Sequence, residues 1–329
     1  MAGKSGRSIN NVPENPMKHI IFSWEGILVI LFILVNIFCA SFSEFYNMKS
    51  VLRQMPVYLA EVFMMFPMAY ILVLGEIDIS VGAIMAVSAA VCCNLLTGGE
   101  RAATEYACPL ILGFLAALVI GALIGCFNGV LVAKLKIQPM VATLIMFTAG
   151  RGIAQLITDG QITYVRVESY KVLGSFLPHV PVPTPFIVAM LMVILTSLIL
   201  KKTALGLYIQ SVGINAKASR LVGIKSTMIV FLTYAFCGIC SGLAGMIASS
   251  RIYSADANNI GLNMELDAIL AVAIGGNSLG GGKFSLAGSV IGAFTIQALT
   301  TTLYAMHVSS DQVPVYKAIV VVIIVALQS

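Results

Sequence analysis

The chain of 329 residues consists largely of long apolar stretches separated by short polar ones. Because an α-helix needs about 20 apolar residues to cross the hydrocarbon core of a membrane, each stretch is a candidate span. We place the spans near 24–42, 55–74, 79–96, 108–133, 139–158, 184–200, 226–248, 264–279, 284–305 and 314–328. Only 10% of the residues are charged, against about 25% in soluble domains, which excludes soluble and disordered chains. The sequence therefore predicts an all-α integral membrane protein, a bundle of about ten transmembrane helices.

The positions of the basic residues predict the direction in which the spans cross. With residues 1–23 as a cytoplasmic N-terminal segment, more lysines and arginines fall inside than outside. The inside loops hold Lys4, Arg7, Lys18, Lys134, Lys136, Lys201, Lys202, Lys217, Arg220, Lys225 and Lys283. The outside loops hold Lys49, Arg53, Arg101, Arg166, Lys171 and Arg251. Because cytoplasmic loops carry the excess of basic residues, we expect both termini in the cytoplasm and a single transmembrane domain over 24–329.

Glycines recur at four-residue spacing within three of the predicted spans. They are Gly121, Gly125 and Gly129, then Gly238 and Gly242, then Gly288 and Gly292. Small residues at this spacing lie on one face of a helix and let a neighbouring backbone approach closely in lipid. We therefore expect a tightly packed bundle rather than separate membrane anchors.

The longest inside connection contains a segment of helical character, residues 207–224. Apolar residues are mixed there with Asn215, Lys217 and Arg220, and Gly213 and Gly223 bracket them. This pattern predicts a short amphipathic helix on the cytoplasmic face. Two interpretations are open: a helix that lies on the membrane surface with its basic residues at the headgroups, or a helix that docks into a groove of a cytoplasmic protein.

The motif GEIDISVG, residues 75–82, places Glu76 and Asp78 in a long apolar run. A charge at membrane depth is costly, so these carboxylates should face a water-filled cavity, a partner or the interface. The flanking glycines permit a broken helix that lines a cavity, and a tight cytoplasmic turn is the alternative interpretation. Polar residues inside other spans, Asn128 among them, either make interhelical hydrogen bonds or line a wet path.

A second polar cluster lies within residues 254–284. We expect Asp256, Asn258 and Asn259 in the last outside loop. Glu265 and Asp267 follow near the outer end of the eighth span, and like Glu76 and Asp78 they lie at a helix break or end, where a pathway could form.

The sequence carries no motif for a nucleotide, a metal or a catalytic centre. GGNSLGGGK resembles a phosphate-binding loop, but Asn277 and Phe284 stand where that loop requires Gly and Ser or Thr. Cys237 and Cys240 lack a second ligand pair, and the cysteines are expected to be small core hydrophobes. We therefore expect no enzyme activity, no cofactor on this chain and no nucleic-acid partner.

Three motifs in order resemble a known family. GEIDISVG resembles the GGIDLSVG signature of permease subunits in bacterial sugar ATP-binding-cassette (ABC) importers of the ribose/xylose/autoinducer-2 type. SVGINAKASRLVGI is similar to the coupling segment of that family, VGGNPEAARLSGI, and AIGGNSLGGGKFSLAGSVIGA to its late glycine-rich segment. Residues 136–162, 201–206 and 255–276 resemble in particular the permeases of the galactofuranose importer.

The resemblance implies a permease of the bacterial cytoplasmic membrane that imports a monosaccharide, galactofuranose or a related sugar. It implies a cytoplasmic ATPase that binds ATP and Mg²⁺, a second, related permease subunit and an extracytoplasmic solute-binding protein. It assigns coupling to the ATPase to Gly213, Asn215, Lys217, Arg220 and Gly223. It assigns the translocation pathway or gate to Glu76, Asp78, Ser80, Asn128, Asp256, Asn258, Asn259, Glu265 and Asp267.

Two residues depart from the family pattern, since Glu76 replaces a glycine of the signature and Lys217 stands where the coupling segment usually has glutamate. The alternative hypothesis is an ion-coupled secondary transporter of a small polar solute, in which one of the buried carboxylates titrates. Such a transporter should show two halves with corresponding interrupted helices, and the sequence shows no convincing internal repeat.

Overall fold

The computed structural model describes residues 66–328, except 177–179, 181, 278–280 and 283–284, and a few isolated residues before position 66. The predicted N-terminal segment, 1–23, lies outside the described residues, as do most of the predicted span at 24–42 and the first half of that at 55–74, apart from Val62.

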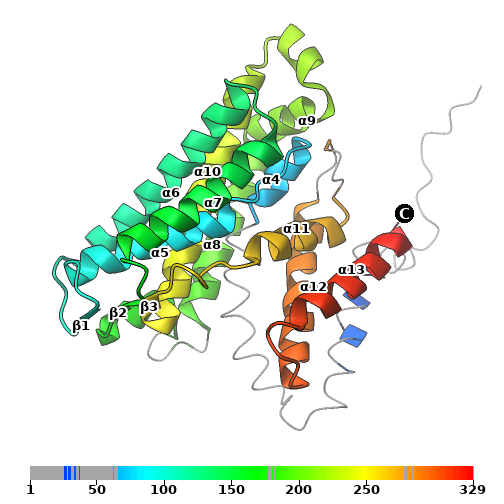
Figure 1. Ribbon diagram of the computed structural model, residues 1–329. Helices are drawn as coiled ribbons and strands as arrows, with labels where there is room; N and C mark the ends of the chain where they lie inside the picture. The colour runs from blue at the N-terminus through cyan, green and yellow to red at the C-terminus, as the bar shows by residue number, and fades with distance from the viewer. Residues whose placement is uncertain are drawn as a thin grey trace, which may run out of the picture.

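Helices dominate the described part of the chain (Figure 1). They are α4 (Met68–Val73), α5 (Val81–Thr97), α6 (Leu110–Ala133), α7 (Pro139–Ile157), the 3-10 helix η1 (Glu168–Leu173), α8 (Thr184–Lys202), α9 (Leu205–Leu221), α10 (Ser226–Ile252), α11 (Met264–Ile274), α12 (Leu286–Ala305) and α13 (Val313–Gln328). Among the described residues, five helices are long and apolar enough to cross a membrane: α6, α7, α8, α10 and α12. The predicted fold class, a helical membrane protein with several spans, is confirmed.

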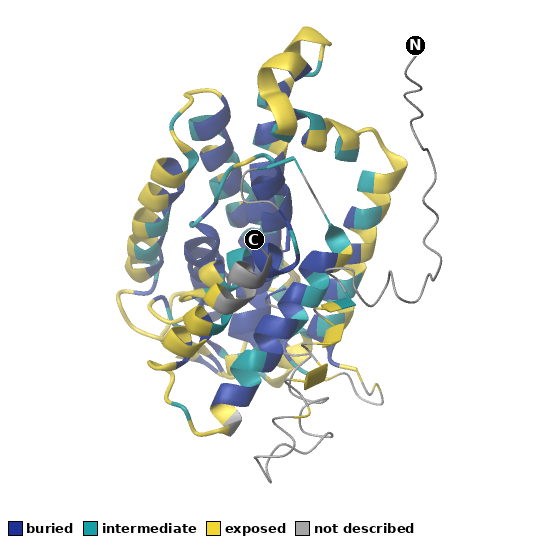
Figure 2. Ribbon diagram, turned by 90° about the vertical axis from the view of Figure 1, so that its right-hand side faces the viewer, coloured by how far each residue is buried: buried dark blue, intermediate teal, exposed yellow. Residues whose placement is uncertain are grey.

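Helix α5 forms the centre of the larger group of helices. It packs against α6, α7 and α10, and almost all of its side chains are buried. Figure 2 shows that the buried residues gather in the centre of the molecule and the exposed ones along its outer sides. Helices α6 and α10 approach through their glycines, because a Cβ on Gly121 would lie 2.6 Å from Gly238 O and one on Gly125 only 2.5 Å from Tyr234 O. The close packing that we predicted from the glycine spacing is confirmed for this pair.

Helices α11, α12 and α13 form a second group beside the first (Figure 1). Helix α12 lies against α11, where a Cβ on Gly288 would overlap Gly275 O and one on Gly292 would overlap Ala271 O. Helix α11 is shorter than the predicted span at 264–279. It ends at Ile274 because Gly275 and Gly276 follow, and Gly276 has a φ of 82° that ends the helix.

Three short strands join loops that are far apart in the sequence. Strand β2 (Thr163–Val165) pairs parallel with β1 (Ala102–Ala103) and antiparallel with β3 (Ser254–Ala255). Tyr164 is opposite Ala102 on one side and Ser254 on the other. All three strands come from loops predicted on the outside, and they lie at the end of the bundle opposite α9 (Figure 1). The structure thus confirms that these three loops lie at the same end of the bundle. Which end of the bundle faces the cytoplasm stays a prediction.

Candidate functional site

A break in the helical chain separates α4 from α5. Asp78 in this break is 1% exposed, and its Oδ1 accepts hydrogen bonds from Ser80 N (2.8 Å) and Ser80 Oγ (2.6 Å). Asn128 Nδ2 on α6 donates to Ser80 Oγ (2.8 Å). The Asp78 carboxylate also lies at the positive N-terminal end of α5, which stabilises it. These three predicted pathway residues therefore lie together and fix the start of α5 inside the bundle.

A second break precedes α11, and Arg151 of α7 holds it. Arg151 Nη1 donates to three backbone carbonyls of the loop, Ala257 O (3.0 Å), Asn258 O (3.3 Å) and Ile260 O (2.6 Å). Non-helical backbone at membrane depth is tolerated where protein groups satisfy its carbonyls in this way. We predicted this segment as the last outside loop, and the structure shows that it lies against the C-terminal half of α7.

The predicted polar residues of this loop form a small network of their own. Asp256 Oδ1 accepts from Asn258 N (3.0 Å) and Asn259 N (3.2 Å), and Asn259 Nδ2 donates to Asp256 Oδ2 (2.6 Å). Gln155 Nε2 on α7 donates to Asn258 Oδ1 (2.6 Å). Asn258 and Asn259 are exposed, so the network leaves polar side chains open at this point.

The two breaks meet each other. A Cβ on Gly82, the second residue of α5, would overlap both Gly261 O and Glu265 Oε2. A Cβ on Gly150, which lies near the middle of α7, would be 3.0 Å from the neighbouring Ala83 Cβ. The start of α11 therefore lies beside the start of α5, close to the middle of α7. Glu265 stands in the first turn of α11, the end of the eighth span at which we expected it. We call Gly82, Arg151, Gly261 and Glu265 the helix junction.

The helix junction contains two opposite charges that do not pair. Glu265 is 4% exposed and its Oε2 has no hydrogen-bond partner, and the same is true of the buried Nε and Nη2 of Arg151. Glu265 and Asp256 both lie near enough to attract the Arg151 guanidinium, yet among the described residues no ion pair within 4 Å joins Arg151 to Glu265. Because unpaired buried polar groups are costly, such atoms usually have water or ligand partners.

Glu76 lies nearer the α9 end of the bundle. Its carboxyl group faces Tyr234 of α10, although neither Glu76 Oε2 nor the Tyr234 hydroxyl makes a hydrogen bond of good geometry. Tyr234 is fully buried and was missed at the sequence level, because a tyrosine in an apolar span is indistinguishable from core packing.

Asp267 is paired, unlike Glu265. Lys317 Nζ of α13 donates to Asp267 Oδ2 (2.7 Å) and Oδ1 (3.0 Å), and both side chains are largely buried. Residues two apart on a helix point about 200° apart, so Asp267 faces away from the side of α11 that carries Glu265. The sequence shows Lys317 within a span but gives no sign of its partner 50 residues away.

The predicted coupling segment is a bent helix rather than the single short helix that we expected. Helix α9 kinks at Asn215, whose φ and ψ are −158° and 97°. Asn215 Oδ1 accepts from Lys217 N (3.0 Å) and Ala218 N (2.9 Å), the arrangement of an N-cap for the short helical turn that follows. Leu221 and Val222 at its end are 89% and 77% exposed.

All three sequence motifs meet at the α9 end of the bundle. A Cβ on Gly213 of α9 would overlap Val73 O, and Gly282 N donates to the same Val73 O (2.9 Å). A Cβ on Gly281 would lie 3.0 Å from Gly75 N and 3.2 Å from Gly213 O. We call Gly75, Gly213 and Gly281 the glycine contact, since only backbone without side chains fits so closely. It joins the coupling segment to both interrupted helices.

Comparisons with known proteins agree with this architecture. A family model described as "Branched-chain amino acid transport system / permease component" matches residues 48–327. The chain is 46% identical to the galactofuranose transporter permease protein YtfT of Escherichia coli. The aligned region of 266 residues covers 80% of this chain and 74% of the relative.

Two further relatives extend the similarity. The fructose import permease protein FruF of Bifidobacterium longum is 40% identical over 265 residues, 80% of this chain and 72% of the relative. The ribose import permease protein RbsC of Bacillus subtilis is 35% identical over 302 residues, 91% of this chain and 90% of the relative. No solved structure matches the chain significantly.

Proposed function

The chain belongs to the branched-chain amino acid transport system / permease component family, and we propose that it carries a monosaccharide, galactofuranose or a related sugar, into the cytoplasm. As a member of this family it is the permease subunit of an ABC importer, a multi-pass membrane protein without enzyme activity of its own. The observation that carries the proposal is that the relatives are named for galactofuranose, fructose and ribose, although the family description names amino acids.

We propose that the sugar passes the helix junction. Arg151 Nε and Nη2 are donors and Glu265 Oε2 is an acceptor, and all three lack partners in a buried place. A sugar hydroxyl both donates and accepts, so one hydroxyl group can satisfy both residues at once. The exposed Asn258 and Asn259 add amide groups beside this point. A neutral polyol carries several such hydroxyl groups, and it can pair with these groups without bringing a further charge into the bundle.

We propose that the ATPase docks on the bent end of α9, where Leu221 and Val222 are exposed beside Asn215 and Lys217. A movement of α9 would reach both interrupted helices through the glycine contact, because α4 and the loop after α11 lie directly against Gly213. Alternating access then follows if ATP and Mg²⁺ on the partner favour one position of α9 over the other. In this arrangement the α9 end and both chain termini face the cytoplasm. A second permease subunit and an extracytoplasmic solute-binding protein complete the importer.

Reconstitution tests the proposal. The permease, its ATPase and its binding protein are placed in proteoliposomes, and uptake of labelled galactose, fructose, ribose and leucine is measured with and without ATP. We expect ATP-dependent uptake of one monosaccharide and none of leucine. Uptake of leucine would overturn the sugar assignment. Uptake by this chain alone, driven by an ion gradient without ATP, would establish the secondary-transporter alternative.

A further inference from the structure

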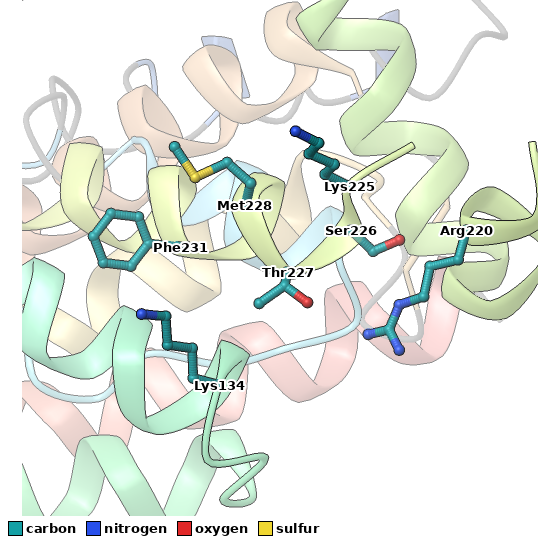
Figure 3. Close-up of a pocket in the computed structure, with 7 residues that line it drawn as sticks. All are labelled: Lys134, Arg220, Lys225, Ser226, Thr227, Met228 and Phe231. Atoms are coloured by element: carbon teal, nitrogen blue, oxygen red, sulfur yellow. The ribbon is translucent and has the colours of Figure 1, made fainter. Parts of the chain in front are cut away.

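A cavity of about 540 Å³ lies at the α9 end of the bundle. Its lining comes from the end of α6, the end of α9 and the first two turns of α10, as Figure 3 shows. The lining residues are Lys134, Arg220, Lys225, Ser226, Thr227, Met228 and Phe231. None of the residues that line the cavity belongs to the helix junction. The cavity is therefore a separate site, and the proposed sugar pathway does not account for it.

The charges of this cavity are all positive. Lys134, Arg220 and Lys225 line it together with two hydroxyl groups, and no acidic side chain is among its lining residues. In the view of Figure 3 the Thr227 hydroxyl lies between Lys134 and Arg220. Among the residues that the structure describes, none of the three cations forms an ion pair with a carboxylate. Three cations around one cavity repel each other, and an anion bound between them removes that repulsion.

The position of Lys225 is the observation that points to a ligand. Lys134 and Arg220 stand at the C-terminal ends of α6 and α9, where a cation is favoured by the helix dipole. Lys225 instead is the N-cap of α10, a helix of 27 residues without an acidic residue in its first turn. A cation at a helix N-terminus is unfavourable, whereas an anion beside it is favoured by the helix dipole. Ser226 N and Met228 N already donate to Ile224 O and Lys225 O, so the anion would pair with the side chains of the cavity.

The apolar part of the lining indicates what carries the anion. Met228 is 49% exposed and Phe231 adjoins it one turn further along α10, on the face that continues to the 41% exposed Leu232. The cavity thus places an anion-binding end next to an apolar helix surface that runs toward the membrane core. An inorganic anion would occupy only the anion-binding end, whereas a phospholipid would occupy that end with its phosphate group and the apolar helix surface with its acyl chain.

We propose that this cavity binds the phosphate group of an anionic phospholipid from the cytoplasmic leaflet, with its acyl chain along Met228 and Phe231. Basic pockets at the cytoplasmic side of membrane helices attract such headgroups. The bound lipid would connect Arg220 at the end of the coupling segment to Lys225 and Lys134. The proposal rests on the orientation given under the proposed function, in which α9 faces the cytoplasm.

Lipid titration of the purified full chain in a neutral detergent tests the proposal. Binding of phosphatidylglycerol, of phosphatidylcholine with the same acyl chains and of inorganic phosphate is measured by native mass spectrometry and by the shift of the apparent Tm. We expect phosphatidylglycerol to saturate at a concentration about a hundredfold lower than phosphatidylcholine, because each of the three basic residues near the headgroup contributes about a fivefold gain. The double variant Lys134→Gln/Lys225→Gln should lose this preference.

The matched control removes two positive charges from the same end of the bundle, outside the cavity. Lys201→Gln/Lys202→Gln changes two exposed lysines at the end of α8 and should keep the phosphatidylglycerol preference within about twofold. An equal loss in this control would overturn the proposal in favour of general surface charge. Equal stabilisation by inorganic phosphate would replace the lipid with a free anion. Displacement of the lipid by the ATPase subunit would assign the cavity to the docking surface instead.

Discussion

The polar side chains around Tyr170 and those of the helix junction both lie within the bundle, but only those around Tyr170 have hydrogen-bond partners for their polar atoms. The Tyr170 hydroxyl lies 2.7 Å from Ser249 Oγ and 3.2 Å from Cys93 Sγ, and Ser250 Oγ donates to Tyr170 O. At the helix junction, Arg151 and Glu265 keep polar atoms without partners. The hydrogen bonds around Tyr170 hold η1 between α5 and α10. The helix junction instead has polar atoms with which a hydroxyl group of a transported sugar could pair.

The backbone around each site supports the same difference. At the strand end, β1, β2 and β3 tie three loops together by main-chain hydrogen bonds. At the junction, two helices begin in the interior of the bundle, and the side chains of Arg151 and Gln155 hold the loop before α11 to α7. Elements that must move are expected to have few such bonds, so we place the moving parts at the junction and the fixed parts at the strand end.

The largest expected effect comes from closing the junction sterically. In Gly82→Ala the new Cβ would overlap Gly261 O and Glu265 Oε2, so α5 and α11 must separate. We expect ATP-driven uptake in proteoliposomes to fall about a hundredfold, as displacements of about 1 Å at a binding site do. Gly152→Ala on α7 is the matched control, because nothing lies within 4 Å of its new Cβ, and it should transport normally. Normal uptake by Gly82→Ala would show that the two breaks are not in contact during transport.

The next effect comes from removing the unpaired charge. Glu265→Gln keeps the shape of the side chain, but it replaces a charged acceptor with a weaker neutral one. We expect the apparent KM for the sugar to rise about tenfold or more, since hydrogen bonds to charged groups contribute about 1.5–3 kcal/mol. The basal ATPase rate of the assembled importer should stay unchanged. An unaltered KM would remove Glu265 from the pathway.

A smaller effect on transport, with a clear effect on stability, is expected for the paired carboxylate of α11. Asp267→Asn breaks the ion pair with Lys317 and leaves a largely buried ammonium group without its partner. We expect a lower apparent Tm in detergent and an uptake rate that falls less than in Glu265→Gln. The charge-exchanged variant Asp267→Lys/Lys317→Asp should recover part of the Tm. If the exchange gives no recovery, the ion pair does not stabilise the contact between α11 and α13.

The smallest effect is expected at the satisfied cluster. Tyr170→Phe removes one hydroxyl group and with it the hydrogen bond to Ser249, at a cost of about 1 kcal/mol. The apparent Tm should fall by about 2–4 °C while uptake stays within about twofold of the unmodified chain. A large loss of uptake without a change in Tm would contradict the view that this region only anchors η1.

Much of the bundle could be predicted because its determinants are local. Apolar runs gave spans close to α6, α7, α8, α10 and α12, and glycine spacing indicated which helix faces approach closely. The bend of α9 was not predicted, although Asn215 is a residue type that favours a helix N-cap over a helix interior.

The helix junction could not be predicted because it depends on contacts between distant residues. Arg151 bonds to carbonyls 106 to 109 residues away, and a polar loop such as 256–263 has the same sequence pattern outside the membrane as inside it. The one available signal was an arginine within a span, which requires a partner at membrane depth. Lys317, a lysine within a span, likewise indicated that it has a partner, which the structure identifies as Asp267. The presence of an arginine or a lysine in a span does not specify where in the chain its partner lies.

The central claim is that sugar hydroxyl groups pair with Arg151 and Glu265 where the two interrupted helices meet. A cryo-electron microscopy structure of the complete importer, trapped with sugar by a hydrolysis-deficient ATPase, tests it most directly. We predict sugar density within hydrogen-bond distance of Glu265 Oε2 and of Arg151 Nε or Nη2. Sugar density elsewhere in the complex, with Arg151 and Glu265 paired to each other and Gly82 still against Gly261, would contradict the account.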